Sequence, residues 1–207
     1  MRRPFPEPRL SVDVLLIRHA AHVQLDATLS GRTPGLSLSE AGRAQAAALA
    51  GRLGAEGIAA VQASPLDRTQ ATARAIAEAA GVEVKTVAAL NEVDFGEWAG
   101  RTFAELAPDP DWDAWNAARS TARAPGGESM AEAQARMVSH LRATAMSHDG
   151  QRIAMVSHCD MIRAAVADIL GLSLDHILRF DIAPASVTRI VVGDWGARVV
   201  SLNEGAW

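Results

Sequence analysis

Short apolar runs alternate along this chain with longer stretches in which apolar residues recur at helical spacing. The short runs predict four clear strands and two weaker ones, at residues 12–17, 58–63, 153–157 and 187–192, then at 82–87 and 198–201. Strands that alternate with helices are typical of an α/β fold whose sheet is mostly parallel. We therefore expect a three-layer α/β/α domain with a mostly parallel central sheet.

Three of the expected helices begin with a capping pattern. Residues 37–40 and 129–132 have the spacing of a capping box, in which glutamate follows serine three positions later. Ser64 before Pro65 predicts an N-cap with proline at the first helical position. The helix after residue 129 should be long and should end near Met146.

The segment from about 91 to 127 departs from the alternation. It holds Trp98, Trp112 and Trp115, three of the five tryptophans in the chain, and the turn-rich stretches "APDPDW" and "APGGES". We expect a small lid insertion over about 91–127 and not a further layer of the sheet.

Composition narrows the picture. The chain has 207 residues, of which 49% are hydrophobic and 21% are charged, and this fits one domain over residues 1–207 with a sizeable core. The formal net charge of -4 gives no basic surface for nucleic acid, so any basic site has to be a local cluster. The single cysteine, Cys159, excludes an internal disulfide framework and a zinc site built from thiolates.

The first ten residues, "MRRPFPEPRL", contain an arginine pair and three prolines but no apolar stretch of the kind found in a secretory signal. We expect residues 1–10 to form a flexible arm. The longest apolar run, around "VLLI", is far shorter than a membrane span. The sequence therefore predicts a cytoplasmic protein with no membrane partner and no nucleic-acid partner.

Polar residues follow the predicted strands at unusual places. "LLIRHA" ends the first strand on Arg18 and His19, "AMVSHCDMIRAAV" ends a later strand on His158, and "VQASPLDR" puts Arg68 at the start of a helix. The carboxyl ends of strands in an open α/β sheet form the edge where ligands bind, so these side chains can converge. Buried charges need a partner, which a bound anion would provide. Phosphate fits best, because arginine gives forked hydrogen bonds and neutral imidazole can attack phosphorus.

Two other interpretations of the histidines stay open at this point. Either histidine alone could be a structural residue that makes a hydrogen bond. Histidine also binds metals, and His22 lies three residues after His19. Against a metal, the neighbouring arginines would repel a divalent cation, and the chain has no H-E-x-x-H motif and no cysteine set.

The same stretches resemble the histidine phosphatase superfamily, which has the phosphoglycerate mutase-like fold. "LLIRHA" is similar to its opening Arg-His-Gly signature, and "SPLDRTQATA" resembles its Ser-Pro-x-x-Arg-Thr-x-x-Thr-Ala segment. "LNEVDFGEWAG" resembles the segment that carries its acid, "PGGES" the start of the helix after its lid, and "VSHCDMIRAAVADILGL" its closing segment. The five segments occur in family order over most of the chain.

The resemblance implies a role for each matching residue. His19 would be the nucleophile and would form a phosphohistidine, and Arg18, Arg68 and His158 would surround the phosphate. Glu92 would be the general acid, and the reaction would need no metal or other cofactor. A lid rich in tryptophan would desolvate Glu92 and raise its pKa, as a proton donor requires.

Positions close to the expected phosphate also depart from the family pattern. Ala20 stands in place of glycine. Its methyl group costs little at negative φ but would be strained at positive φ, so we infer that the loop tolerates alanine here. Ala21 and His22 replace an acidic or hydroxyl pair that is common after the signature, and His22 becomes a candidate substrate contact. Cys159, which replaces a glycine, is another candidate contact, and we expect its thiol to be inert. Arg32, in "SGRTPG", could contact a second anionic group of the substrate, although a solvated turn arginine is the simpler interpretation.

The expected activity is hydrolysis of a small phosphorylated substrate. The alternatives are a phosphoglycerate-type phosphomutase and, from another class, a module that binds a phosphorylated ligand without turnover. Hydrolysis is favoured by two features. Family mutases usually carry glycine and then an acidic or hydroxyl residue at the positions of Ala20 and Ala21, and their insertion is longer. The five retained motif residues favour an enzyme over a binding module. We expect a monomer or a homodimer.

Overall fold

The computed structural model describes residues 11–205, and the arm expected at 1–10 lies outside them. The strands are β1 Ser11–Arg18, β2 Ile58–Ala63, β3 Val84–Thr86, β4 Arg152–Ser157, β5 Val187–Gly193 and β6 Gly196–Glu204. All six predicted strands are therefore present. The last is longer than its apolar run suggested, because β6 pairs with β5 as an antiparallel hairpin along most of its length.

The strands form one sheet in the order β3-β2-β4-β1-β5-β6. The first four of these run parallel to one another, whereas β5 is antiparallel to β1 and β6 is antiparallel to β5. The sheet is thus mixed and mostly parallel, as predicted. Within the parallel part, the carboxyl ends of β1 and β4 lie side by side, with Arg18 opposite Ser157.

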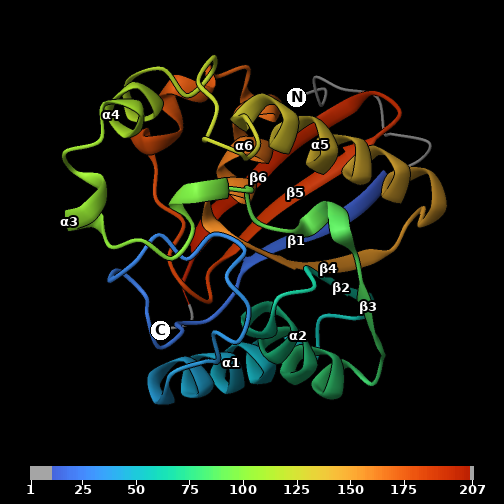
Figure 1. Ribbon diagram of the computed structural model, residues 1–207. Helices are drawn as coiled ribbons and strands as arrows, with labels where there is room; N and C mark the ends of the chain where they lie inside the picture. Colours follow the sequence, from blue (N-terminus) through green and yellow to red (C-terminus); the bar gives the residue numbers. More distant parts are fainter. Residues whose placement is uncertain (1–10, 206–207) are drawn as a thin grey trace.

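Helices cover both faces of the sheet and complete the three layers (Figure 1). The long helices are α1 Glu40–Leu53, α2 Asp67–Ala80, α5 Met130–Ser147 and α6 Cys159–Leu170. Side chains of β1 alternate between the faces, so Leu15 and Ile17 join the core on the side of α1 and α2. Val14 and Leu16 join the core under α5 and α6. No helix within 11–205 combines the length and the apolar character that a membrane crossing needs.

The remaining elements are short and are η1 Ala88–Leu90, η2 Gly96–Trp98, α3 Phe103–Leu106, α4 Pro110–Ala117 and η3 Leu174–Arg179. Those from η2 to α4 fall in the segment expected as a lid. Trp98 and Trp115 are buried there with ring centroids 6.0 Å apart, and Trp112 lies edge-on to Trp98 at 5.4 Å. The tryptophans therefore form the core of this segment.

Two of the predicted helix starts have different outcomes. α5 begins after Ser129, whose hydroxyl accepts from the backbone N–H of Glu132 while the Glu132 carboxylate accepts from the N–H of Ser129. This capping box is confirmed. The box predicted at 37–40 is wrong, because Ser39 caps α1 instead by accepting from the N–H of Gly42.

Candidate active site

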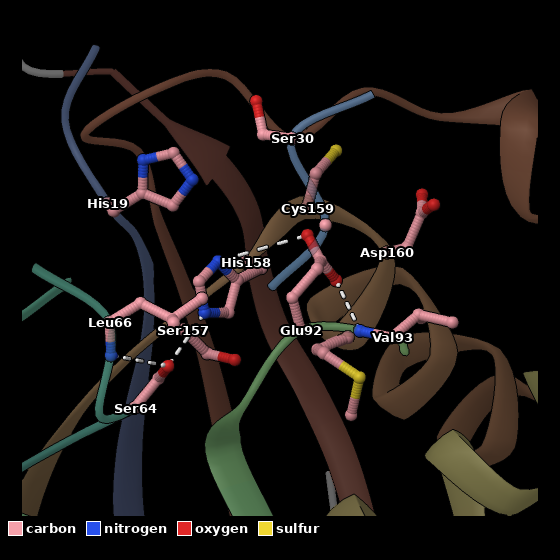
Figure 2. A network of polar contacts seen from close by, with 12 residues as sticks. His19, Ser30, Ser64, Leu66, Glu92, Val93, Ser157, His158, Cys159 and Asp160 are labelled. Carbon is pink, nitrogen blue, oxygen red and sulfur yellow. Dashed lines mark hydrogen bonds and ion pairs between the residues drawn. The ribbon is translucent and has the colours of Figure 1, made fainter. Parts of the chain in front are cut away.

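Four of the predicted site residues meet at the carboxyl edge of the sheet. Arg18 ends β1 and His19 directly follows it, His158 follows β4, and Arg68 is the second residue of α2. The ring centroids of His19 and His158 are 5.2 Å apart, and Nε of Arg68 is 3.3 Å from Nε2 of His19. Figure 2 shows the two histidines and Glu92 turned toward one space.

His19 is buried and held in one tautomer. Its Nδ1 is 2.9 Å from the carbonyl oxygen of Ala20, which can only accept, so Nδ1 carries the proton and Nε2 carries the lone pair. Burial and then the positive charge of Arg68 hold the pKa of His19 well below its usual value. The ring is therefore neutral and presents Nε2 to the pocket. The non-glycine residues with positive φ within 11–205 do not include Ala20. Alanine at this position therefore causes no backbone strain.

Arg18 and Arg68 bring positive charge with spare donors. Nη2 of Arg68 donates to the carbonyl oxygen of Gly31 at 2.6 Å, and Nη1 of Arg18 donates to that of Ile182 at 2.6 Å. Within 11–205, Nη1 of Arg68 and Nε of Arg18 are buried without a partner. Unsatisfied buried donors on cations are costly, so an anion in the pocket would stabilise both side chains.

His158 is fully buried behind the pocket. Its Nε2 lies 2.8 Å from Oγ of Ser64, and its Nδ1 accepts from Nη2 of Arg68 at 3.3 Å. The N-cap predicted at Ser64 is wrong, because α2 begins at Asp67 after an uncapped start. The Ser64 hydroxyl instead orients the His158 ring so that Nδ1 faces the pocket.

Glu92 carries the carboxyl that can donate a proton. It is 9% exposed, and its Oε1 accepts from the backbone N–H of Val93 at 3.0 Å. Burial and then the negative charge of Asp160 raise the pKa of Glu92 to about 7. A carboxyl with such a pKa holds a proton at weakly acidic pH and can release it during a reaction.

Two arginines fix the backbone at Glu92. Nη2 of Arg136, on α5, and Nε of Arg32 both donate to the Glu92 carbonyl oxygen at 2.9 Å. The other Arg32 nitrogens donate to Asp94 at 3.1 Å and Glu128 at 2.9 Å. Arg32 does not line the pocket. Its contacts give it a positioning role, in place of the contact with a second anionic group considered from the sequence.

His22 and Cys159 do line the pocket. The His22 ring is 5.4 Å from that of His19, and its Nδ1 accepts from the N–H of Gln24 at 3.3 Å. Burial and then the charge of Arg68 lower the pKa of His22 to about 4, so its ring is neutral. Burial and then the charge of Asp160 raise the pKa of the Cys159 thiol to about 11, so the thiol stays protonated.

The pocket has a volume of about 180 Å³, small beside the roughly 300–1,000 Å³ of typical ligand sites. Its wall also includes residues to which the sequence analysis gave no role, namely Asp26, Ser30, Phe95, Phe103, Asp160 and Arg163. These come from loops, from the start of α3 and from the first turns of α6, where sequence alone does not say which side chains face a ligand. Within 11–205, no three histidine, cysteine, aspartate or glutamate side chains are arranged to hold a metal ion.

Comparison with known proteins decides the family. The sequence model of the histidine phosphatase superfamily, branch 1, matches residues 14–205. The chain belongs to this superfamily. All five motif segments of this histidine phosphatase lie within the match, and the structure gives it the three-layer fold that the resemblance implied.

Individual relatives of this histidine phosphatase carry enzyme names. Phosphoserine phosphatase 1 of Hydrogenobacter thermophilus is 32% identical over 197 residues, covering 93% of this chain and 92% of the relative. A probable phosphoglycerate mutase of Serratia proteamaculans is 32% identical over 184 residues, covering 86% and 84%. The solved structure of a mycobacterial glucosyl-3-phosphoglycerate phosphatase superposes with a TM-score of 0.84 at 25% identity, covering 94% and 100%. The family and these names support a phosphatase for small phosphomonoesters.

Proposed function

We propose that this histidine phosphatase hydrolyses a small phosphomonoester in two steps, through a phosphohistidine formed on His19. The observation that carries the proposal is the state of the His19 ring. With the Nδ1 proton bound to the Ala20 carbonyl, the Nε2 lone pair lies beside the guanidinium of Arg68. A neutral imidazole in this position can attack phosphorus, and the adjacent cation stabilises the transferred group.

In the first step, Nε2 of His19 bonds to phosphorus while the bond from phosphorus to the ester oxygen breaks. The transition state spreads negative charge over three phosphoryl oxygens. The unpartnered N–H groups of Arg18 and Arg68 would donate to these oxygens. The departing alkoxide takes the proton of Glu92, whose pKa of about 7 suits a donor at weakly acidic pH.

In the second step, water attacks phosphorus and the bond from phosphorus to Nε2 of His19 breaks. Glu92, now ionised, takes a proton from the attacking water. Phosphate then leaves, and both side chains return to their starting protonation states. The proposed steps use no metal ion.

A phosphomutase is the second candidate, supported by the name of the Serratia relative. A mutase returns the phosphoryl group to another hydroxyl and must keep water away from the phosphohistidine. Hydrolysis is favoured by Ala20 and Ala21 at the positions where family mutases usually carry glycine and then a polar residue, and by the relatives named as phosphatases. A binding module without turnover is less consistent with a neutral nucleophile and a protonated acid in one pocket.

The substrate would be small, because the pocket is small. The named relatives act on phosphoserine and glucosyl-3-phosphoglycerate, so a phosphorylated metabolite is the substrate class they support. We also propose that the protein acts in the cytoplasm, which its single free cysteine supports. A monomer or a homodimer stays the prediction for its assembly.

Turnover of an aryl phosphate between pH 5 and 8, with and without EDTA, tests the proposal. We expect hydrolysis that the chelator does not change. Loss of activity on chelation would contradict a reaction without metal, and absence of activity at every pH would contradict a phosphatase.

The phosphohistidine is tested by His19→Ala. This variant should lose both turnover and the acid-labile phosphoryl label that the enzyme acquires from a labelled substrate. His176→Ala, on η3 and outside the pocket lining, is the matched control and should retain both. Labelling that persists in His19→Ala would assign the nucleophile to another residue.

A further inference from the structure

Asp160 lines the pocket but takes no part in the two steps above. It is the second residue of α6, two positions after His158, and its side chain is 18% exposed. Figure 2 shows its carboxylate on the far side of Glu92 from His158 in that view. Asp160 therefore puts a negative charge into a pocket whose base is positively charged.

The Asp160 carboxylate keeps unused acceptor capacity. Its Oδ2 is 3.5 Å from Nη1 of Arg119, and its Oδ1 is 3.4 Å from Nη1 of Arg163. Both contacts are long, since charged N–H groups and carboxylate oxygens usually approach to about 2.7–2.9 Å. A carboxylate offers about four acceptor positions, so two long contacts leave room for a donor from a ligand.

The two arginines hold Asp160 in place and are themselves engaged. Arg119 comes from the segment after α4, is 6% exposed, and lies with its guanidinium carbon 5.8 Å from the ring centroid of Trp115. Its Nη2 donates to Oδ1 of Asn116 at 2.8 Å. This packing fixes Arg119 against the segment core. Within 11–205 its Nε is buried without a partner, but Arg119 does not line the pocket, so it is not placed to bind a second anionic group of a substrate.

Arg163 also binds acceptor groups of the protein. Its Nε donates to the Phe180 carbonyl oxygen at 3.2 Å, and its Nη2 is 3.5 Å from Oδ1 of Asp181. A second acidic residue, Asp26, also lines the pocket. Beyond the phosphate region, the pocket wall therefore carries the carboxylates of Asp26 and Asp160, while the cation of Arg163 is bound to acceptors of the protein.

We propose that Asp160 selects phosphomonoesters whose leaving group carries an ammonium group near the ester oxygen, the class of small phosphorylated amino alcohols. This inference rests on the proposed phosphatase activity. The ammonium group would donate to the open side of the Asp160 carboxylate while the phosphoryl group occupies the site of Arg18 and Arg68. The negative charge of Asp160 would repel a leaving group that has a carboxylate in the same place.

The test compares kcat/KM for phosphoethanolamine with that for glycerol 3-phosphate, which has a neutral leaving group, and for 3-phosphoglycerate, which has an anionic one. We expect the wild-type protein to prefer phosphoethanolamine over both. Asp160→Asn should lower that preference roughly tenfold, the size of one charge-assisted hydrogen bond, mainly through KM. Because the charge of Asp160 also raises the pKa of Glu92, the ratio between substrates is the readout, and it cancels a common change in proton donation.

Two further variants complete the test. Asp160→Glu keeps the charge and should retain a preference for phosphoethanolamine. Asp168→Asn, on the exposed side of the same helix and outside the site pocket, makes the same change in net charge and should leave the ratio unaltered. A ratio that Asp160→Asn does not change, or a wild-type preference for 3-phosphoglycerate, would overturn the proposal. Turnover of an aryl phosphate, which carries no ammonium group, is measured alongside and reports on the phosphatase activity independently of Asp160 selectivity.

Discussion

Oε2 of Glu92 lies 3.8 Å from Nδ1 of His158, in a pair that is almost wholly buried. Burial moves the two pKa values in opposite directions, since it raises that of Glu92 and lowers that of His158. The pair is therefore a protonated acid beside an unprotonated imidazole at weakly acidic pH. Oγ of Ser64, 2.8 Å from Nε2 of His158, holds the ring in the orientation that keeps its Nδ1 near Glu92.

Glu92→Gln should separate substrates by leaving group. The amide fills the same space but has no acidic proton, so kcat for an alkyl phosphate should fall roughly hundredfold or more. 4-Nitrophenyl phosphate should lose much less, because nitrophenolate leaves without protonation. Glu97→Gln, an exposed residue of η2, is the control and should behave like the wild-type protein with both esters. Equal losses on the two esters in Glu92→Gln would contradict the role of general acid.

The pH profile of kcat for an alkyl phosphate should report the same group. A general acid works only while protonated, so kcat should fall as the pH rises through about 7, the pKa of Glu92. His19 must be unprotonated, and its lowered pKa puts the acidic limb well below pH 6.5. In Glu92→Gln the limb near pH 7 should disappear. Its persistence in that variant would assign the limb to another group.

Arg136 should act as a positioning residue for Glu92. Its guanidinium donates to the carbonyl oxygens of Ala89, Asn91 and Glu92, so it holds the whole turn that carries the acid. Arg136→Ala should lower kcat for an alkyl phosphate roughly tenfold, and the free energy of unfolding by about 2 kcal/mol. The partly buried carbonyl groups of Ala89 and Asn91 would lose this donor, and that of Glu92 would keep only Arg32.

The loss in Arg136→Ala should be smaller with an aryl phosphate, which a purely structural defect would not produce. Arg136→Lys should recover part of the alkyl activity. Arg142→Ala, exposed on the same helix, should change neither stability nor the ratio between the two esters. A uniform loss on both substrates would mean that Arg136 supports the fold only.

The contrast between His19 and Arg136 shows how far the sequence could predict the site. His19 ends an apolar strand, and strand ends in a parallel sheet share one edge, so its place was predictable from local pattern. Arg136 lies in the middle of a helix, and whether it faces the acid depends on how α5 rotates and packs against the sheet. Asp160 was missed for the same reason.

Arg32 and Ser64 illustrate a second limit. Both were noticed, Arg32 as a possible substrate contact and Ser64 as a helix cap, but each has partners far away in the sequence. Arg32 is bound by Asp94 and Glu128, and Ser64 lies against His158. Such partners follow from the tertiary packing of loops, which no local spacing encodes.

Cys159 should be chemically inert despite its place in the pocket. Burial and the charge of Asp160 raise the pKa of its thiol to about 11, and the thiolate is the form that reacts with oxidants. Activity of the wild-type protein after mild peroxide treatment should match that of Cys159→Ser, treated or untreated. Oxidative loss that Cys159→Ser prevents would instead support regulation through this thiol.

Gly42 and Gly51 give a matched pair of substitutions on α1 with opposite expected signs. A Cβ added at Gly42 would lie 1.8 Å from the carbonyl oxygen of Ala21, whereas one at Gly51 would meet nothing within 4 Å. Ala21 belongs to the loop between His19 and His22, and its carbonyl accepts from the backbone N–H of Ser39 at 3.0 Å. The absence of a side chain at Gly42 therefore lets the start of α1 pack directly on the loop of the nucleophile.

Gly42→Ala should lower the free energy of unfolding by about 2–3 kcal/mol, because the loop or the helix has to move away. It should also lower kcat, since the same loop contains the Ala20 carbonyl that orients His19. Gly51→Ala should raise the free energy of unfolding by about 0.5–1 kcal/mol, because alanine favours an exposed helix position over glycine. Urea denaturation measures both effects, and the slope of the free energy of unfolding against urea concentration should stay unchanged. If both variants proved more stable than the wild-type protein, the contact between Gly42 and Ala21 would not be the constraint described, and the loop would be free to adjust without disturbing His19.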